Sequence, residues 1–151
     1  MTNMHKVYLG LGSNLGDRYE HIKRAVRLIG ERVGDVIRQS SFIETEPWGF
    51  ESPNRFLNGV ICCETTKTPH EVLKLTQQIE REMGKRKEHA TRRSQIDNRK
   101  SVNRKYFDRP IDIDILLYDD LTIDEPDLKI PHPLMYERDF VMIPLKEIKE
   151  E

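Results

Sequence analysis

The sequence lacks any apolar run approaching the roughly 20 residues that a membrane span requires. Its first six residues lack the charged-then-apolar pattern of a secretory signal. Cysteine is scarce: Cys62 and Cys63 are the two present, and adjacent residues of a strand point to opposite faces, which rules out a disulfide framework. These absences argue against a membrane or disulfide-stapled protein, and we expect a cytoplasmic one.

What the sequence does contain is a charge-rich globular composition. Its 151 residues are 34% charged and 36% hydrophobic, which fits one domain over residues 1–151 with a single hydrophobic core. The net charge of -1 conceals an asymmetry, because residues 85–109 carry a net +7 and the remainder carries -8. A charge run alone is more often a solvated loop, but a basic segment on an acidic body also suits a polyanionic ligand.

The hydrophobic pattern predicts four main strands and two helices. A capping motif predicts the start of the second helix at residues 68–71. Thr68 is the capping residue, Pro69 takes the first helical position and Glu71 takes the capping-box position. The fourth strand is expected to have a short hairpin partner over 121–123. The β-α-β-β-α-β order is that of a ferredoxin-like α+β sandwich, an antiparallel sheet with helices on one face, here with a C-terminal extension. The predicted strands span residues 7–11, 36–45, 56–65 and 111–118.

An aspartate pair stands out on the fourth predicted strand. Asp112 and Asp114 are two residues apart, so both carboxylates point to one face while the neighbouring isoleucines point toward the helices. Two close carboxylates repel unless a cation lies between them, and their hard oxygens suit Mg²⁺. A bare D-x-D is more often a solvent-facing pair, but Arg109 and the basic segment lead into this one. We therefore expect a magnesium site that serves phosphoryl-type transfer.

A glycine-rich segment over residues 10–16 is predicted to form a tight turn after the first strand. It does not match the dinucleotide-binding motif G-x-G-x-x-G, because it has one extra residue before its last glycine. It does not match the P-loop either, because G-K-[ST] is absent.

Several aromatic and imidazole side chains are candidate ligand contacts. Trp48, Phe56 and Phe140, with Asn58, suit a flat aromatic ligand held by stacking and amide hydrogen bonds, although each aromatic alone is more often core. His132 stands between two prolines on a rigid segment, where it is placed to donate a hydrogen bond to a phosphate.

Five segments occur in an order that carries a family resemblance. Together they resemble 6-hydroxymethyl-7,8-dihydropterin pyrophosphokinase, an enzyme family of folate synthesis, and the R-x-x-D-[aliphatic]-D-[aliphatic] segment is the most specific. The segments are residues 8–17 (YLGLGSNLGD), 45–49 (TEPWG), 56–58 (FLN), 109–116 (RPIDIDIL) and 130–133 (IPHP) followed by 138–140 (RDF).

The resemblance implies transfer of pyrophosphate from ATP to the hydroxymethyl group of 6-hydroxymethyl-7,8-dihydropterin, with release of AMP. It implies that Asp112 and Asp114 hold two Mg²⁺ ions among the ATP phosphates, and that Lys85 and Arg109 are further catalytic residues. It places Gln77 and Glu80 on the exposed side of the second helix, near the adenosine. The ATP-binding positions that it implies are Gln77, Glu80, Lys87, Tyr106, Ile115, His132 and Arg138.

The resemblance also implies a pterin site in which Phe56 and Phe140 stack on the two faces of the ring. The positions are Thr45, Glu46, Trp48, Phe56, Asn58 and Phe140.

The basic segment departs from the family pattern. It is longer than the usual form, in which this loop closes over the substrates, and we expect that role here. Lys85 stands where the family usually has Arg, which keeps the charge but removes a bidentate fork.

The alternatives are a ferredoxin-like RNA-binding module and a small-molecule-sensing module. The basic segment favours RNA, but the first and third strands lack interleaved aromatics and the body is acidic. We expect a monomer that binds ATP and the pterin, without nucleic acid or membrane. Turnover of ATP would separate the enzyme from both alternatives.

Overall fold

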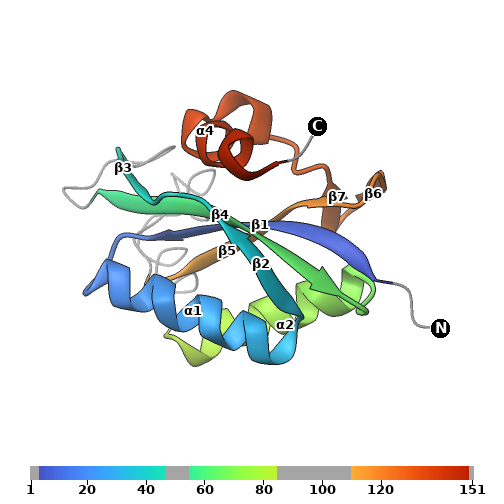
Figure 1. The fold of residues 1–151 in the computed structure, drawn as a ribbon, viewed down its shortest axis with the longest axis horizontal. Coiled ribbons are helices and arrows are strands. Elements are labelled where there is room, and N and C mark those ends of the chain that lie inside the picture. The colour runs from blue at the N-terminus through green and yellow to red at the C-terminus, as the bar shows by residue number, and fades with distance from the viewer. Residues whose placement is uncertain (1–3, 47–54, 85–109, 150–151) are drawn as a thin grey trace, which may run out of the picture.

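The structure is a computed structural model that describes residues 4–46, 55–84 and 110–149. A five-stranded antiparallel sheet lies at its centre, in the order β2-β4-β1-β5 with β3 paired to β4 (Figure 1). The sheet strands are β1 (His5–Ser13), β2 (Asp35–Gln39), β3 (Ile43–Thr45), β4 (Phe56–Thr65) and β5 (Asp112–Tyr118). The helices are α1 (Arg18–Arg32), α2 (Pro69–Glu82) and α4 (Asp139–Ile148), with a short 3-10 turn η2 (Met135–Glu137) before α4.

The sheet has an apolar core on each face. Helices α1 and α2 cover one face, as predicted, and their apolar stripes meet the inward residues of β1 and β5, including the predicted isoleucines of β5. Helix α4 covers the other face over β4 (Figure 1). Within the described ranges, no helix is both long enough and apolar enough to cross a membrane.

The capping signal of α2 is confirmed. The Glu71 backbone N–H donates to Thr68 Oγ1 at 3.2 Å, and the Thr68 N–H donates to Glu71 Oε1 at 2.8 Å. Both bonds satisfy donors that a helix start leaves without intrahelical partners.

The predicted turn over residues 10–16 is wrong in its first half, because β1 continues through Ser13. Strand β1 is paired on both sides, with β4 and with β5, so its backbone is held by two ladders. The glycines therefore lie in the middle of the sheet. The predicted strand over 36–45 is also divided, since Ser40 Oγ accepts the Val60 N–H at 2.9 Å where a continuous ladder would use a main-chain carbonyl.

The predicted hairpin partner of β5 over 121–123 is wrong. Strand β6 (Ile123–Glu125) pairs instead with β7 (Leu128–Ile130) in a separate two-stranded sheet. The chain turns away from β5 at Asp119, which adopts a φ of 49° and donates its N–H to Lys6 O at 2.8 Å. This bond ties the end of β5 to the start of β1.

The adjacent cysteines face opposite cores, as predicted. Cys62 lies in the core beneath α4 and Cys63 in the core beneath α1 and α2, and both are buried. Burial raises the pKa of the Cys62 thiol, and it raises that of Cys63 to about 12.

We expect both thiols of the native protein to resist a thiol reagent at about pH 8 and to react once the chain is unfolded, because only the thiolate attacks. The raised pKa of Cys63 also means that the native state keeps a proton that the unfolded state loses above its ordinary thiol pKa. Its contribution to stability is therefore complete below that pKa and is lost as pH rises toward about 12. Timed thiol titration with and without denaturant measures the first effect, and fast labelling of the native protein would contradict it.

Candidate active site

The aspartate pair faces a strip of backbone without side chains. In the register of β1 and β5, Asp112 is opposite Gly12 and Asp114 is opposite Gly10. Both carboxylates are half-buried, on the face of the sheet opposite the α1–α2 core. Because glycine has no Cβ, β1 itself places no side chain beside either carboxylate, and the Leu116 side chain packs over Gly10 instead. We call this face of the sheet the floor.

The same floor leads to the predicted pterin residues on β4. Gly12 is opposite Asn58 in the β1–β4 register, so Asp112, Gly12 and Asn58 form one row across three strands. A Cβ at Gly12 would lie 2.6 Å from Asn58 Oδ1 and 3.4 Å from Phe56 Cδ1. Phe56 and Asn58 therefore approach the β1 backbone closely, and residue 12 must be glycine for them to do so.

Asn58 is itself fixed in place. It is 8% exposed, and its Nδ2 donates to Thr45 Oγ1 on β3 at 2.6 Å. The structure thus brings together Thr45, Phe56 and Asn58 from two strands. Sequence reasoning missed Gly12, which makes room for Asn58 and Phe56, and Gly10, which makes room for Leu116. The available signal was the match between a G-x-G of period two on one strand and a D-x-D of period two on another.

Glu80 is not where the sequence reading placed it. It was expected on the exposed side of α2 near the adenosine, but it is 7% exposed and its Oε2 accepts the Ile113 N–H at 2.7 Å. Strand β5 is the last strand of the sheet, so alternate N–H groups point away from β1 and need acceptors from elsewhere. Glu80 supplies one between the two aspartates.

We expect Glu80→Ala to lower the free energy of unfolding by about 1–3 kcal/mol, because the Ile113 N–H loses its acceptor in a buried place. Glu80→Gln keeps an acceptor oxygen, so its loss should be smaller. Gln78→Ala, at an exposed position of the same helix, serves as the control. Urea unfolding of the three variants measures the effect, and equal midpoints would contradict the role assigned to this contact.

Two other predicted ATP residues lie on α2 and on β5. Gln77 is exposed on α2, as expected. Ile115 is 5% exposed and packs into the core, so only its main chain is available to a nucleotide.

The His132 segment is fastened to β5 by its backbone. The His132 N–H donates to Leu116 O at 3.0 Å, and its Nδ1 accepts the Leu134 N–H at 3.3 Å. An Nδ1 that accepts a hydrogen bond leaves the proton of the neutral ring on Nε2. The neutral His132 ring therefore carries its proton on Nε2, the kind of donor that its predicted contact with phosphate requires.

Arg138 and Phe140 mark the start of α4. Arg138 is 7% exposed, and its guanidinium carbon lies 5.6 Å from the centre of the Phe140 ring. Phe140 is half-buried against the core beneath α4. Glu46, the residue after β3, is exposed and forms an ion pair with Arg55 at 2.6 Å.

Five predicted site residues lie outside the described residues. They are Trp48, Lys85, Lys87, Tyr106 and Arg109.

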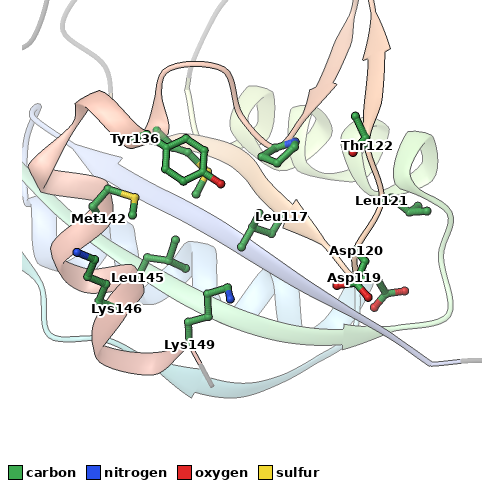
Figure 2. Close-up of a pocket in the computed structure, with 12 residues that line it drawn as sticks. Leu117, Asp119, Asp120, Leu121, Thr122, Tyr136, Met142, Leu145, Lys146 and Lys149 are labelled. Carbon is green, nitrogen blue, oxygen red and sulfur yellow. The ribbon is translucent and has the colours of Figure 1, made fainter. Parts of the chain in front are cut away.

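A pocket of about 610 Å³ lies at the far end of β5, between α4 and the segment that leads into β6 (Figure 2). Leu117 and Leu145 form part of its apolar lining, while Asp120 and Lys149 bring charge of both signs. None of the predicted site residues lines it. This pocket and the aspartate pair are therefore separate features.

The donor set at the aspartate pair fits Mg²⁺. Asp112 and Asp114 offer carboxylate oxygens on one face of a strand, and such oxygens are the hard ligands that Mg²⁺ prefers.

Comparison with solved structures defines the fold class of the protein. A Plasmodium falciparum HPPK-DHPS triple mutant matches with a TM-score of 0.69 at 16% identity, over 98% of this chain and 40% of that one. A second HPPK-DHPS structure in complex with substrates matches with a TM-score of 0.66 at 15% identity, over 97% of this chain and 40% of that one. The protein therefore has the mixed α/β fold of these domains, with an antiparallel sheet and, over the residues described, three α-helices.

Sequence comparison gives the family. The family model for 7,8-dihydro-6-hydroxymethylpterin-pyrophosphokinase (HPPK) matches residues 8–150. The 2-amino-4-hydroxy-6-hydroxymethyldihydropteridine pyrophosphokinase of Porphyromonas gingivalis is 46% identical over 94% of this chain and 89% of its own. The enzyme of the same name from Bacillus subtilis is 39% identical over 95% and 78%. The chain belongs to the HPPK family.

Proposed function

We propose that this protein transfers the pyrophosphoryl group of ATP to the hydroxymethyl oxygen of 6-hydroxymethyl-7,8-dihydropterin and releases AMP, as a step of folate biosynthesis. The observation that supports the proposal is the row Asp112–Gly12–Asn58, in which the carboxylate proposed to bind metal and the amide proposed to bind the pterin share one face of the sheet. The names of the family and of its relatives support the same reaction.

Asp112 and Asp114 would hold two Mg²⁺ ions against the ATP phosphates. When bound, the ions supply positive charge that offsets the charge developing on the phosphate oxygens. The work of the two carboxylates is to anchor this charge, and neither acts as a general base. Glu80 holds the strand between them through the Ile113 N–H.

The pterin would lie on the floor beside β4. Asn58, kept in one orientation by Thr45, offers the ring edge its carbonyl oxygen and its remaining amide hydrogen. Phe56 and Phe140 would stack on the two faces of the ring. Glu46 and Trp48 complete the proposed pterin site.

The polyphosphate would be held from the β5 side and by the basic segment. His132 donates from Nε2, and Arg138 adds positive charge. The proposed phosphate contacts outside the described residues are Lys85, Lys87, Tyr106 and Arg109. Gln77 and the main chain of Ile115 are proposed to border the adenosine, whereas Glu80 is assigned to support of β5.

The chemical step is a displacement at the β-phosphorus. The hydroxymethyl oxygen forms a bond to this phosphorus, the bond to the oxygen that bridges it to the α-phosphorus breaks, and the hydroxyl proton passes to solvent. Catalysis of such a transfer is mainly positioning and charge stabilisation. We also propose that the sheet order corresponds to a ferredoxin-like sandwich and that the protein acts as a cytoplasmic monomer without nucleic acid or membrane.

Product analysis tests the reaction. Incubation with ATP, Mg²⁺ and the hydroxymethyl dihydropterin should give AMP and a pyrophosphorylated pterin in equal amounts, separated by ion-exchange chromatography. Formation of ADP would indicate transfer of a single phosphoryl group and would contradict the proposal. RNA binding without turnover would favour the alternative module, and that binding would weaken steeply with salt.

A further inference from the structure

A second cluster of metal-ligating side chains lies away from the aspartate pair. His70, Glu125 and Asp127 each offer one ligand atom, and these atoms all lie within 4.8 Å of one another. His70 Nε2 and Glu125 Oε1 are already 2.8 Å apart. All three side chains are exposed, so a solvated ion can reach them.

The cluster joins two elements that are both locally constrained. His70 is in the first turn of α2, directly after Pro69, and this turn is fixed by the capping box of Thr68 and Glu71. Glu125 and Asp127 flank Pro126 in the tight turn between β6 and β7, where Glu125 pairs with Leu128. A proline in a turn and a capped helix start both reduce the freedom that a ligand would have to remove.

A second histidine–carboxylate pair in the chain provides a comparison. His5 Nδ1 and Asp119 Oδ2 are 2.7 Å apart, much like the His70–Glu125 pair. Asp119 uses its other oxygen to accept the Lys6 N–H at 2.7 Å. Among the residues that the structure describes, a third ligating group joins the pair at His70 but not the pair at His5. The third ligating group therefore distinguishes the His70 cluster from an ordinary surface ion pair.

We propose that His70, Glu125 and Asp127 form a site for a divalent transition metal of the Zn²⁺ class, independent of the Mg²⁺ site on β5. One imidazole nitrogen and two carboxylate oxygens form a mixed N/O set of the kind that binds Zn²⁺, whereas Mg²⁺ prefers oxygen alone. Three protein ligands leave a fourth position for water. The ion replaces the hydrogen bond between His70 and Glu125.

Such an ion would fasten the β6–β7 hairpin to α2. The hairpin forms its own two-stranded sheet, and β7 runs directly into the segment that carries His132. The site would thus restrain one approach to the proposed phosphate contacts without touching the substrates. Its test is independent of pyrophosphoryl transfer, because the readouts are metal binding and stability.

Zinc titration of the full chain, free of any affinity tag and in excess Mg²⁺, tests the proposal. Calorimetry should show one more equivalent of Zn²⁺ bound to wild type than to either His70→Ala or Asp127→Asn. The His5→Ala variant, which removes the other histidine–carboxylate pair, should bind as much as wild type. Zn²⁺ should also raise the melting temperature of wild type and His5→Ala more than that of His70→Ala, since a ligand of the native state stabilises it.

The result that would overturn the site is an equal zinc stoichiometry in wild type, His70→Ala and Asp127→Asn. Circular dichroism of each variant without metal checks that it is folded, and Asp127→Asn preserves the size of the side chain. A ring-nitrogen NMR shift of His70 on addition of Zn²⁺ gives a direct second readout, and its absence at saturating Zn²⁺ would equally contradict the proposal.

Discussion

Asp112→Asn and Asp114→Asn should each reduce the rate of AMP formation by about 10³-fold or more, the scale seen when a group that stabilises transition-state charge is lost. Asparagine keeps the size of the side chain but removes the negative charge on which the proposed Mg²⁺ site depends. The effect should fall on kcat, measured by AMP release at saturating ATP and pterin.

Asp120→Asn is the matched control for this pair. Asp120 is an exposed acid just beyond the end of β5, where it lines the separate pocket (Figure 2). Its substitution should leave AMP formation unchanged. A rate close to wild type in either variant of the pair would show that the metal anchor has been assigned to the wrong residues.

Gly12→Ala should reduce kcat/KM for the pterin by about 10²-fold, the scale expected when a positioning group moves by about an ångström. The added Cβ would lie 2.6 Å from Asn58 Oδ1, so Asn58 must shift and its bond to Thr45 must stretch or break. The apparent affinity for ATP should change less, because Asn58 is assigned to the proposed pterin site and not to the ATP site.

Gly30→Ala makes the same chemical change where space is open. A Cβ at Gly30 has nothing within 4 Å, and the residue lies inside α1, so this variant should gain about 0.5–1 kcal/mol of stability and keep full activity. Steady-state kinetics with varied pterin and thermal unfolding separate the two outcomes. An unchanged kcat/KM for the pterin in folded Gly12→Ala would contradict the role of this glycine.

The sequence predicted the parts of this fold that leave a periodic or local signal. The alternation of apolar and other residues predicted the central parts of the strands and the shared face of Asp112 and Asp114. The capping residues from Thr68 to Glu71 predicted the start of α2. Those signals depend on side chains within a few positions of one another, so one chain is enough to recognise them.

The parts that were missed depend on contacts between distant segments. Gly10 and Gly12 looked like a turn because glycine has no side chain to show a strand period, and only the ladders on both sides of β1 reveal their role. Glu80 was read as exposed because it follows the apolar stripe of α2, whereas the edge of β5 requires an acceptor at that point. The predicted hairpin partner of β5 was wrong for a similar reason, because the Asp119 N–H bonds to β1 and the chain turns away from β5 at this residue.

Metal binding in the presence of a non-hydrolysable ATP analogue tests the central claim most directly. Mn²⁺ in place of Mg²⁺ can be counted by electron paramagnetic resonance, with wild type compared with Asp112→Asn and Asp114→Asn. The proposed site predicts two Mn²⁺ ions per nucleotide complex in wild type and a loss in each variant, with Asp120→Asn unchanged. Equal Mn²⁺ binding in wild type and both variants of the pair would contradict it.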